Sequence, residues 1–163
     1  MRLLFDLQAL QNGSRTRGIG RYVLSLLTAL AQRPDVEVWG LLNSALREHL
    51  EEARKVAAEV LGEDRLIVFQ GLADTARINE DNHQRRELAE IAYEQFIGSL
   101  DFDALVVGSL FEGFEDNTTV SLKNADAGYR KYVILYDLIP LLGFSAQSRD
   151  GEPMELIIRG RTL

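Results

Sequence analysis

Residues 12–22 read Asn12-Gly13-Ser14-Arg15-Thr16-Arg17-Gly18-Ile19-Gly20-Arg21-Tyr22. The apolar run Leu3-Leu4-Phe5 before this stretch predicts a buried strand, and residues 19–32 have the apolar spacing of a helix. A loop that carries glycines and arginines therefore connects the first strand to the first helix. Open α/β sheets bind their ligands at such positions, at the carboxyl ends of the strands.

The composition of this loop favours an anionic ligand. Gly18 and Gly20 allow the backbone to approach a bound group closely, and N–H groups at the start of a helix attract phosphate or carboxylate. Arg15, Arg17 and Arg21 add three cations with the bidentate geometry that suits phosphate. The alternative interpretation is a tight turn with solvated arginines.

Two well-known nucleotide-binding loops do not fit the sequence. A P-loop requires Lys and Ser or Thr where this chain has Ile19 and Gly20. A dinucleotide fingerprint requires a third glycine where Val23 stands, and the second predicted strand is followed by Asn43 rather than by an acid for a ribose. An oxidoreductase with a nucleotide cofactor is therefore disfavoured.

The bulk composition limits the remaining classes. The chain has 163 residues, a formal charge of −7 and no cysteine, which suits one soluble domain and argues against a nucleic-acid partner. Without cysteine and with two histidines, no metal site is expected. The sequence shows no membrane-spanning run and no signal-peptide pattern, so we expect a cytoplasmic protein, or one peripheral at the inner face of the cell membrane.

Apolar runs alternate with helical periodicity along the chain. We expect strands over residues 3–7, 36–42, 66–69, 104–107 and 132–136. Helices are expected over residues 19–32, from a cap at Asn43 or Ser44 to Gly62, and over residues 83–100. The apolar positions expected to face the core are Ile19, Tyr22, Val23, Leu26 and Leu30 in the first helix, and Leu88, Ile91, Ala92, Phe96 and Ile97 in the third. This order predicts an α/β protein, with a Rossmann-like parallel sheet and helices on both faces.

Two further loops follow predicted strands and should open at the same edge as the glycine loop. One, with a short helix considered for residues 108–128, contains Ser109-Leu110-Phe111-Glu112-Gly113-Phe114-Glu115-Asp116. There Glu112 could accept hydrogen bonds from sugar hydroxyls or act as a base, and the two phenylalanines could stack on a sugar. The alternative places both phenylalanines in the core and makes Glu115 and Asp116 helix caps. Asp137 follows the fifth predicted strand, where a turn or cap role is equally open.

Three motifs of this chain, in this order, resemble those of group 1 (family 4) glycosyltransferases, especially mannosyltransferase-like members of bacterial surface-polysaccharide assembly. They are Asp6-Leu7-Gln8 with residues 14–22, Ser109-Leu110-Phe111-Glu112-Gly113 with Asp116 and Val120-Ser121, and Tyr136-Asp137-Leu138-Ile139-Pro140-Leu141. The resemblance covers residues 1–142. It implies the N-terminal half of a GT-B fold, in which two Rossmann-like domains face a cleft, and an enzyme that retains the anomeric configuration without a metal or other cofactor.

The resemblance also implies roles for particular residues. Gly18 and Gly20, with Arg17 or Arg21, would approach the donor diphosphate across the cleft. Glu112 and Asp137 would be the catalytic-side carboxylates, and Phe111 and Gly113 would contact the acceptor. The donor would be a nucleotide-sugar such as GDP-mannose, and the acceptor a glycan or lipid-linked glycan.

The sequence departs from the family after residue 142. We expect this chain to lack the donor-binding C-terminal domain, and residues 143–163 read as a tail or linker that need not belong to the domain. We therefore expect an N-terminal acceptor-side domain that is inactive alone. The alternative is a non-catalytic α/β module that binds an anionic ligand at residues 13–21.

Overall fold

The computed structural model describes residues 1–124 and 127–135 of the chain. This part forms one parallel sheet in the order β3-β2-β1-β4-β5. The strands are β1 (Arg2–Asp6), β2 (Glu37–Asn43), β3 (Leu66–Phe69), β4 (Ala104–Val107) and β5 (Arg130–Val133). The α-helices are α1 (Gly18–Ala31), α2 (Leu50–Leu61) and α3 (His83–Gly98). Short 3-10 turns cover Gln8–Leu10, Arg47–His49, Glu63–Arg65 and Glu80–Asn82.

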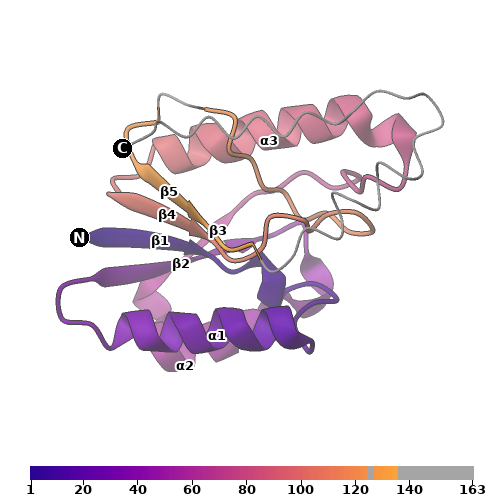
Figure 1. The fold of residues 1–163 in the computed structure, drawn as a ribbon. Coiled ribbons are helices and arrows are strands. Elements are labelled where there is room, and N and C mark those ends of the chain that lie inside the picture. The colour runs from indigo at the N-terminus through magenta and orange to yellow at the C-terminus, as the bar shows by residue number, and fades with distance from the viewer. Residues whose placement is uncertain (125–126, 136–163) are drawn as a thin grey trace.

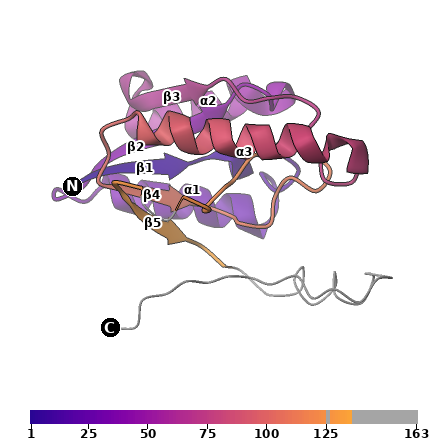
Figure 2. The same cartoon turned by 90° about the horizontal axis from the view of Figure 1, so that it is seen from above.

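The helices lie on both faces of the sheet, as the sequence predicted. In Figure 1, α1 and α2 lie below the sheet and α3 lies above it, and Figure 2, seen from above, shows α3 in front of the sheet. The reason is the handedness of the connections: the chain moves outward from β1 to β3 and then returns to β4. A right-handed connection in the reversed direction must pass on the opposite face.

Alternating residues of β1 supply both halves of the core. Leu3 and Phe5 pack toward α1 and α2, whereas Leu4 packs toward α3 with Tyr93 and Ile97. A strand that is covered on both faces must be apolar on both, which is why these central strands appear in the sequence as continuous apolar runs.

The second predicted helix begins later than expected. The prediction of a cap at Asn43 or Ser44 is wrong, because α2 begins at Leu50 and Asn43 is the last residue of β2. Asn43 instead closes a turn, in which its Oδ1 accepts a hydrogen bond from the Ala45 amide at 2.8 Å. Gly62 does end α2, with the positive φ of 87° that favours glycine.

Part of the predicted inward face of the helices is also wrong. Tyr22 on α1 is 50% exposed, and Leu88 and Ile91 on α3 are 60% and 58% exposed. Ala92 is exposed as well, and α3 turns Ala89, Tyr93 and Ile97 to the core instead. Apolar side chains lie all around α3, so periodicity alone could not identify the buried side.

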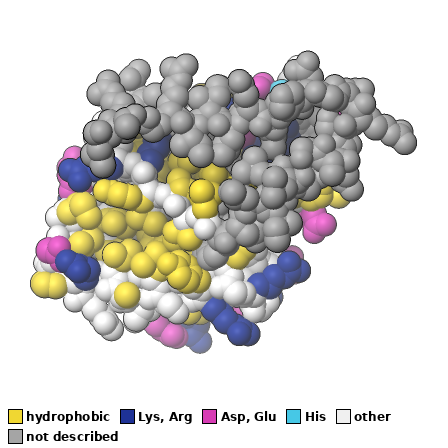
Figure 3. Space-filling view, viewed as in Figure 1, with side chains coloured by type: hydrophobic (Ala, Val, Ile, Leu, Met, Phe, Trp, Pro, Cys, Tyr) yellow, Lys and Arg dark blue, Asp and Glu magenta, His cyan; other side chains and the backbone are white. Residues whose placement is uncertain are grey.

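The connection from β4 to β5 contains no helix in its described residues, 108–124 and 127–129. Val120, Leu122 and Tyr129 of this connection pack against the α3 side of the core. Ile134 packs against the α1 side of the core, while Tyr132 and Leu135 are 47% and 48% exposed. Figure 3 shows a broad hydrophobic area at the level of β4, β5 and α1.

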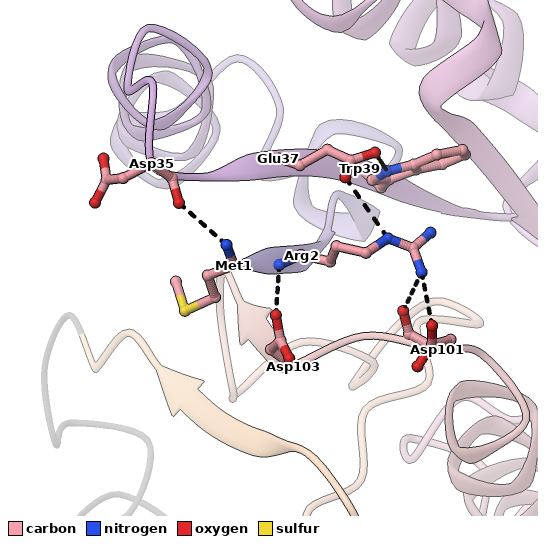
Figure 4. Close-up of polar contacts among 7 residues, drawn as sticks. All are labelled: Met1, Arg2, Asp35, Glu37, Trp39, Asp101 and Asp103. Carbon is pink, nitrogen blue, oxygen red and sulfur yellow. Dashed lines mark hydrogen bonds and ion pairs between the residues drawn. The ribbon is translucent and has the colours of Figure 1, made fainter.

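The amino edge of the sheet is tied together around Arg2 (Figure 4). The Arg2 amide donates to Asp103 Oδ2 at 2.7 Å, and its guanidinium pairs with Asp101 Oδ2 at 3.2 Å and Glu37 Oε2 at 3.7 Å. The Met1 ammonium donates to the Asp35 carbonyl at 3.1 Å. These exposed contacts fix the start of β1 at the edge of the sheet opposite to the carboxyl ends of the strands.

Candidate functional site

The loops after β1 and β4 meet at the carboxyl edge of the sheet. β1 and β4 are neighbours in the sheet, yet the chain leaves β1 toward α1 on one face and reaches β4 from α3 on the other. Such a reversal of strand order creates the crevice in which α/β proteins bind their ligands. The expectation that the glycine loop and the Glu112 loop share one edge is therefore met.

Glu112 joins these two loops. Its carboxylate accepts hydrogen bonds from Asn12 Nδ2 at 2.8 Å, from Ser14 Oγ at 3.1 and 3.2 Å, and from Ser109 Oγ at 2.8 Å. The three donors are buried while Glu112 itself is only partly buried. The carboxylate is thus held in a fixed orientation by Ser109 of its own loop and by two residues about 100 positions away in the sequence.

Gly20 and Gly18 differ in their surroundings. A Cβ on Gly20 would lie 2.3 Å from the Arg15 carbonyl oxygen, whereas a Cβ on Gly18 would meet nothing within 4 Å. Gly20 is therefore required for the packing of the loop backbone on α1. Gly18 leaves open space at the helix start, which is the property that close approach of a ligand needs.

The amides of this loop are largely used within the loop. The Ser14 carbonyl accepts hydrogen bonds from the amides of Arg17 and Gly20, and the Arg17 carbonyl accepts one from the Arg21 amide. The expectation that the N–H groups of the helix start are free is wrong for the Arg17 and Gly20 amides, because the turn before α1 folds back over its first residues. The Arg21 bond is the ordinary first hydrogen bond of α1.

The three arginines of the loop do not act alike. Arg15 pairs with Glu52 at 3.4 Å, so that part of its charge is neutralised. Arg17 and Arg21 are exposed, and within the described residues neither forms an ion pair. These two side chains supply the positive charge at the beginning of α1.

The Glu112 loop has a tightly packed backbone. Gly113 has a φ of 85°, and a Cβ there would lie 2.4 Å from the Thr118 carbonyl oxygen, so glycine is required by the loop itself. Asp116 Oδ1 accepts a hydrogen bond from the Thr118 amide at 2.8 Å. Neither Glu115 nor Asp116 caps a helix within the described residues, so that alternative is wrong.

The two phenylalanines of this loop are not core residues. Phe114 is 41% exposed and Phe111 is partly buried, and neither belongs to the two hydrophobic clusters of the described core. The interpretation of both as core residues is therefore wrong. Phe111 is the neighbour of Glu112 in the sequence of this loop.

A buried polar network lies beneath the two loops. Gln8 Nε2 donates to Asp6 Oδ2 at 2.8 Å and to the Thr119 carbonyl at 2.7 Å. Gln8 Oε1 accepts a hydrogen bond from the side-chain Nδ2 of Asn43 at 2.7 Å. Gln11 exchanges two hydrogen bonds with the Asn43 backbone. Sequence reasoning missed this network, although polar residues directly after buried apolar strands were a signal for it.

Asp6 is the charged member of this network. It is 3% exposed, and accepts hydrogen bonds from the Tyr93 hydroxyl at 2.6 Å and from the Gln8 amide at 2.9 Å. Burial raises the pKa of Asp6 above its ordinary value, because loss of hydration outweighs these hydrogen bonds. Burial, and then the neighbouring carboxylate, raise the pKa of the Tyr93 hydroxyl well above its ordinary value.

The raised pKa of Asp6 predicts a pH-dependent stability. Its stabilising contribution is fully present below the unfolded pKa and is lost as pH rises through the higher folded pKa. The advantage of the wild type over Asp6→Asn in free energy of unfolding should therefore shrink as pH rises from about 4. Urea unfolding of both proteins across pH measures this difference, and an advantage that stays constant or grows would contradict the assignment.

The remaining sequence-predicted features fall elsewhere. Asp137, with the rest of residues 136–142, and the predicted tail 143–163 lie outside the described residues. In the part of the chain that is described, no group of three or more acidic or histidine side chains is placed to hold a metal ion. None of the described helices has the length and hydropathy of a membrane span.

Comparison with known proteins gives partial matches. No protein-family model and no solved structure matches the chain. Curated proteins with similar sequences carry the name of a mannosyltransferase.

These relatives, from Escherichia coli, are named serotype-specific mannosyltransferase WbdA. One is 28% identical over 144 residues, which cover 87% of this chain and 17% of the relative. Another is 33% identical over 95 residues, which cover 58% of this chain and 12% of the relative. The chain thus spans less than a fifth of the length of the relatives it matches.

Proposed function

We propose that this chain is the N-terminal, acceptor-side domain of a retaining GT-B glycosyltransferase. The observation that carries the proposal is the meeting of the glycine loop and the Glu112 loop at the reversal of strand order. The mannosyltransferase relatives support a mannose-type sugar, donated by a nucleotide-sugar such as GDP-mannose. The acceptor is a glycan or lipid-linked glycan at the cytoplasmic side of the membrane.

In this proposal the glycine loop and the Glu112 loop have different roles. The open space at Gly18 and the exposed Arg17 and Arg21 accommodate the diphosphate of the donor. Gly20 acts by shaping the loop that carries these groups.

On the acceptor side, Phe111 offers a ring to the sugar and Gly113 maintains the loop. Glu112 accepts a hydrogen bond from a sugar hydroxyl beside the reacting centre. We assign Asp137 to the same cleft as the second carboxylate. Transfer also requires stabilisation of the departing diphosphate, for which the proposal calls on a separate donor domain. The chain alone should therefore be inactive.

The proposal predicts specific, weak binding of mannose oligosaccharides to the isolated chain. Titration of the ¹⁵N-labelled chain with an α-mannotriose should shift the amide resonances of residues 12–18 and 109–114, while cellotriose should leave them unchanged. A transfer assay with GDP-mannose should show no product from the chain alone. Resonance shifts confined to the amino edge around Arg2, or clear transfer without a partner, would contradict the proposal.

Arg17 and Arg21 also favour a second function, a non-catalytic module that binds an anion at residues 13–21. Both are exposed beside the start of α1 and form no ion pair within the described part of the chain. This function predicts that inorganic pyrophosphate shifts the resonances of residues 15–21 and that no oligosaccharide shifts those of residues 109–114.

A further inference from the structure

Three buried polar side chains surround the Glu112 carboxylate. Asn12 and Ser14 belong to the loop after β1, and Ser109 belongs to the loop after β4. All three are at most 9% exposed. Each donates a hydrogen bond to the Glu112 carboxylate.

The three donors come from both loops. Ser109 reaches Oε1 from the same loop as Glu112, and Asn12 reaches Oε2 from the opposite loop. Ser14 Oγ lies within 3.2 Å of both carboxylate oxygens. The carboxylate therefore cannot rotate without losing a hydrogen bond, and its orientation depends on both loops.

Asn12 is itself held in place. Its Oδ1 accepts a hydrogen bond from the Ser14 amide at 2.9 Å, and its Nδ2 also donates to Thr118 Oγ1 at 3.1 Å. A supporting shell that is fixed in this way gives a functional carboxylate the precise orientation that binding and reaction need.

We infer that Asn12, Ser14 and Ser109 are positioning residues, which orient Glu112 toward a sugar hydroxyl and couple its orientation to the glycine loop. This inference rests on the proposed function, because it assigns Glu112 a contact with the sugar. These three residues act through Glu112 and do not contact the reacting atoms.

Serine variants test the inference more cleanly than an Asn12 variant, because Asn12 also supports the Ser14 amide. The double variant Ser14→Ala with Ser109→Ala removes two of the three donors and retains Asn12. Ser25→Ala is the matched control: Ser25 is an exposed serine on α1 whose hydroxyl donates to the Arg21 carbonyl. Ser109→Thr retains a hydroxyl and should restore part of the function.

The measurement is the affinity of the ¹⁵N-labelled chain for α-mannotriose, with the melting temperature recorded for each variant. The double alanine variant should bind at least about tenfold more weakly, which corresponds to ~1.4 kcal/mol. Its melting temperature should change little, while Ser25→Ala should bind like the wild type. Ser109→Thr should bind more tightly than Ser109→Ala, which a loss of packing alone would not produce.

Two outcomes separate this inference from the proposed function. If Glu112→Ala abolishes α-mannotriose binding while the double serine variant binds normally, the positioning role is wrong and the proposed function stands. If the wild-type chain itself does not bind α-mannotriose, the proposed function fails and the positioning role fails with it.

Discussion

Replacement of Gly20 by alanine should lower the free energy of unfolding by about 3 kcal/mol, although alanine is the better helix former. The new Cβ would lie 2.3 Å from the Arg15 carbonyl oxygen. The clash is with backbone, and that carbonyl belongs to a turn that is closed by hydrogen bonds from the Arg17 and Gly20 amides to Ser14. The loop can therefore relieve the clash only by opening this turn.

Gly18→Ala is the matched control for this prediction. It adds the same methyl group two residues earlier, where nothing lies within 4 Å. Its free energy of unfolding should be unchanged or raised by up to ~1 kcal/mol. Urea unfolding monitored by circular dichroism measures both variants, and equal stabilities would show that the loop does not pack on α1 as described.

Replacement of Asp6 by alanine should lower the free energy of unfolding by about 3 kcal/mol. Three buried donors, the Tyr93 hydroxyl, the Gln8 amide and Gln8 Nε2, would lose their acceptor. Each buried donor left without a partner costs about 1 to 3 kcal/mol, and the removed burial cost of the carboxylate offsets part of the sum.

Asp103→Ala is the control for the Asp6 prediction. Asp103 is an exposed aspartate that accepts the Arg2 amide at the amino edge of the sheet, and its loss should cost less than about 1 kcal/mol because water replaces it. Tyr93→Phe combined with Asp6→Ala should be less destabilising than the sum of the two single variants, because the two side chains share one hydrogen bond. If the destabilisations of the two single variants simply added, the two side chains would not interact.

Much of the fold could be predicted from the sequence, because each central strand is apolar on both faces. Residues 66–69 and 104–107 form β3 and β4 as expected. Gly62 ends α2 because its positive φ suits a residue without a Cβ. The buried side of α3 could not be predicted, since its apolar residues lie on both faces and only the position of the sheet decides between them.

The candidate site could also be predicted only in part. The glycine loop and Glu112 stand out in the sequence because glycine, arginine and an acid occur in the loops that follow apolar strands. Asn12, Ser14 and Ser109 carry no such signal. Asn12 and Ser14 reach Glu112 across about 100 residues, and no local pattern records such contacts.

The sequence by itself determined which segments of this chain become strands and helices and which loops follow the strand ends, because these depend on local apolar spacing and on glycine. Only the tertiary structure decided that Asn12 and Ser14 hold Glu112, that Gly20 is required by the Arg15 backbone, and that Asp6 meets Tyr93 in the core. The physical reason is that hydrogen bonds and close backbone contacts depend on which strands become neighbours, and that order is established only when the whole sheet assembles.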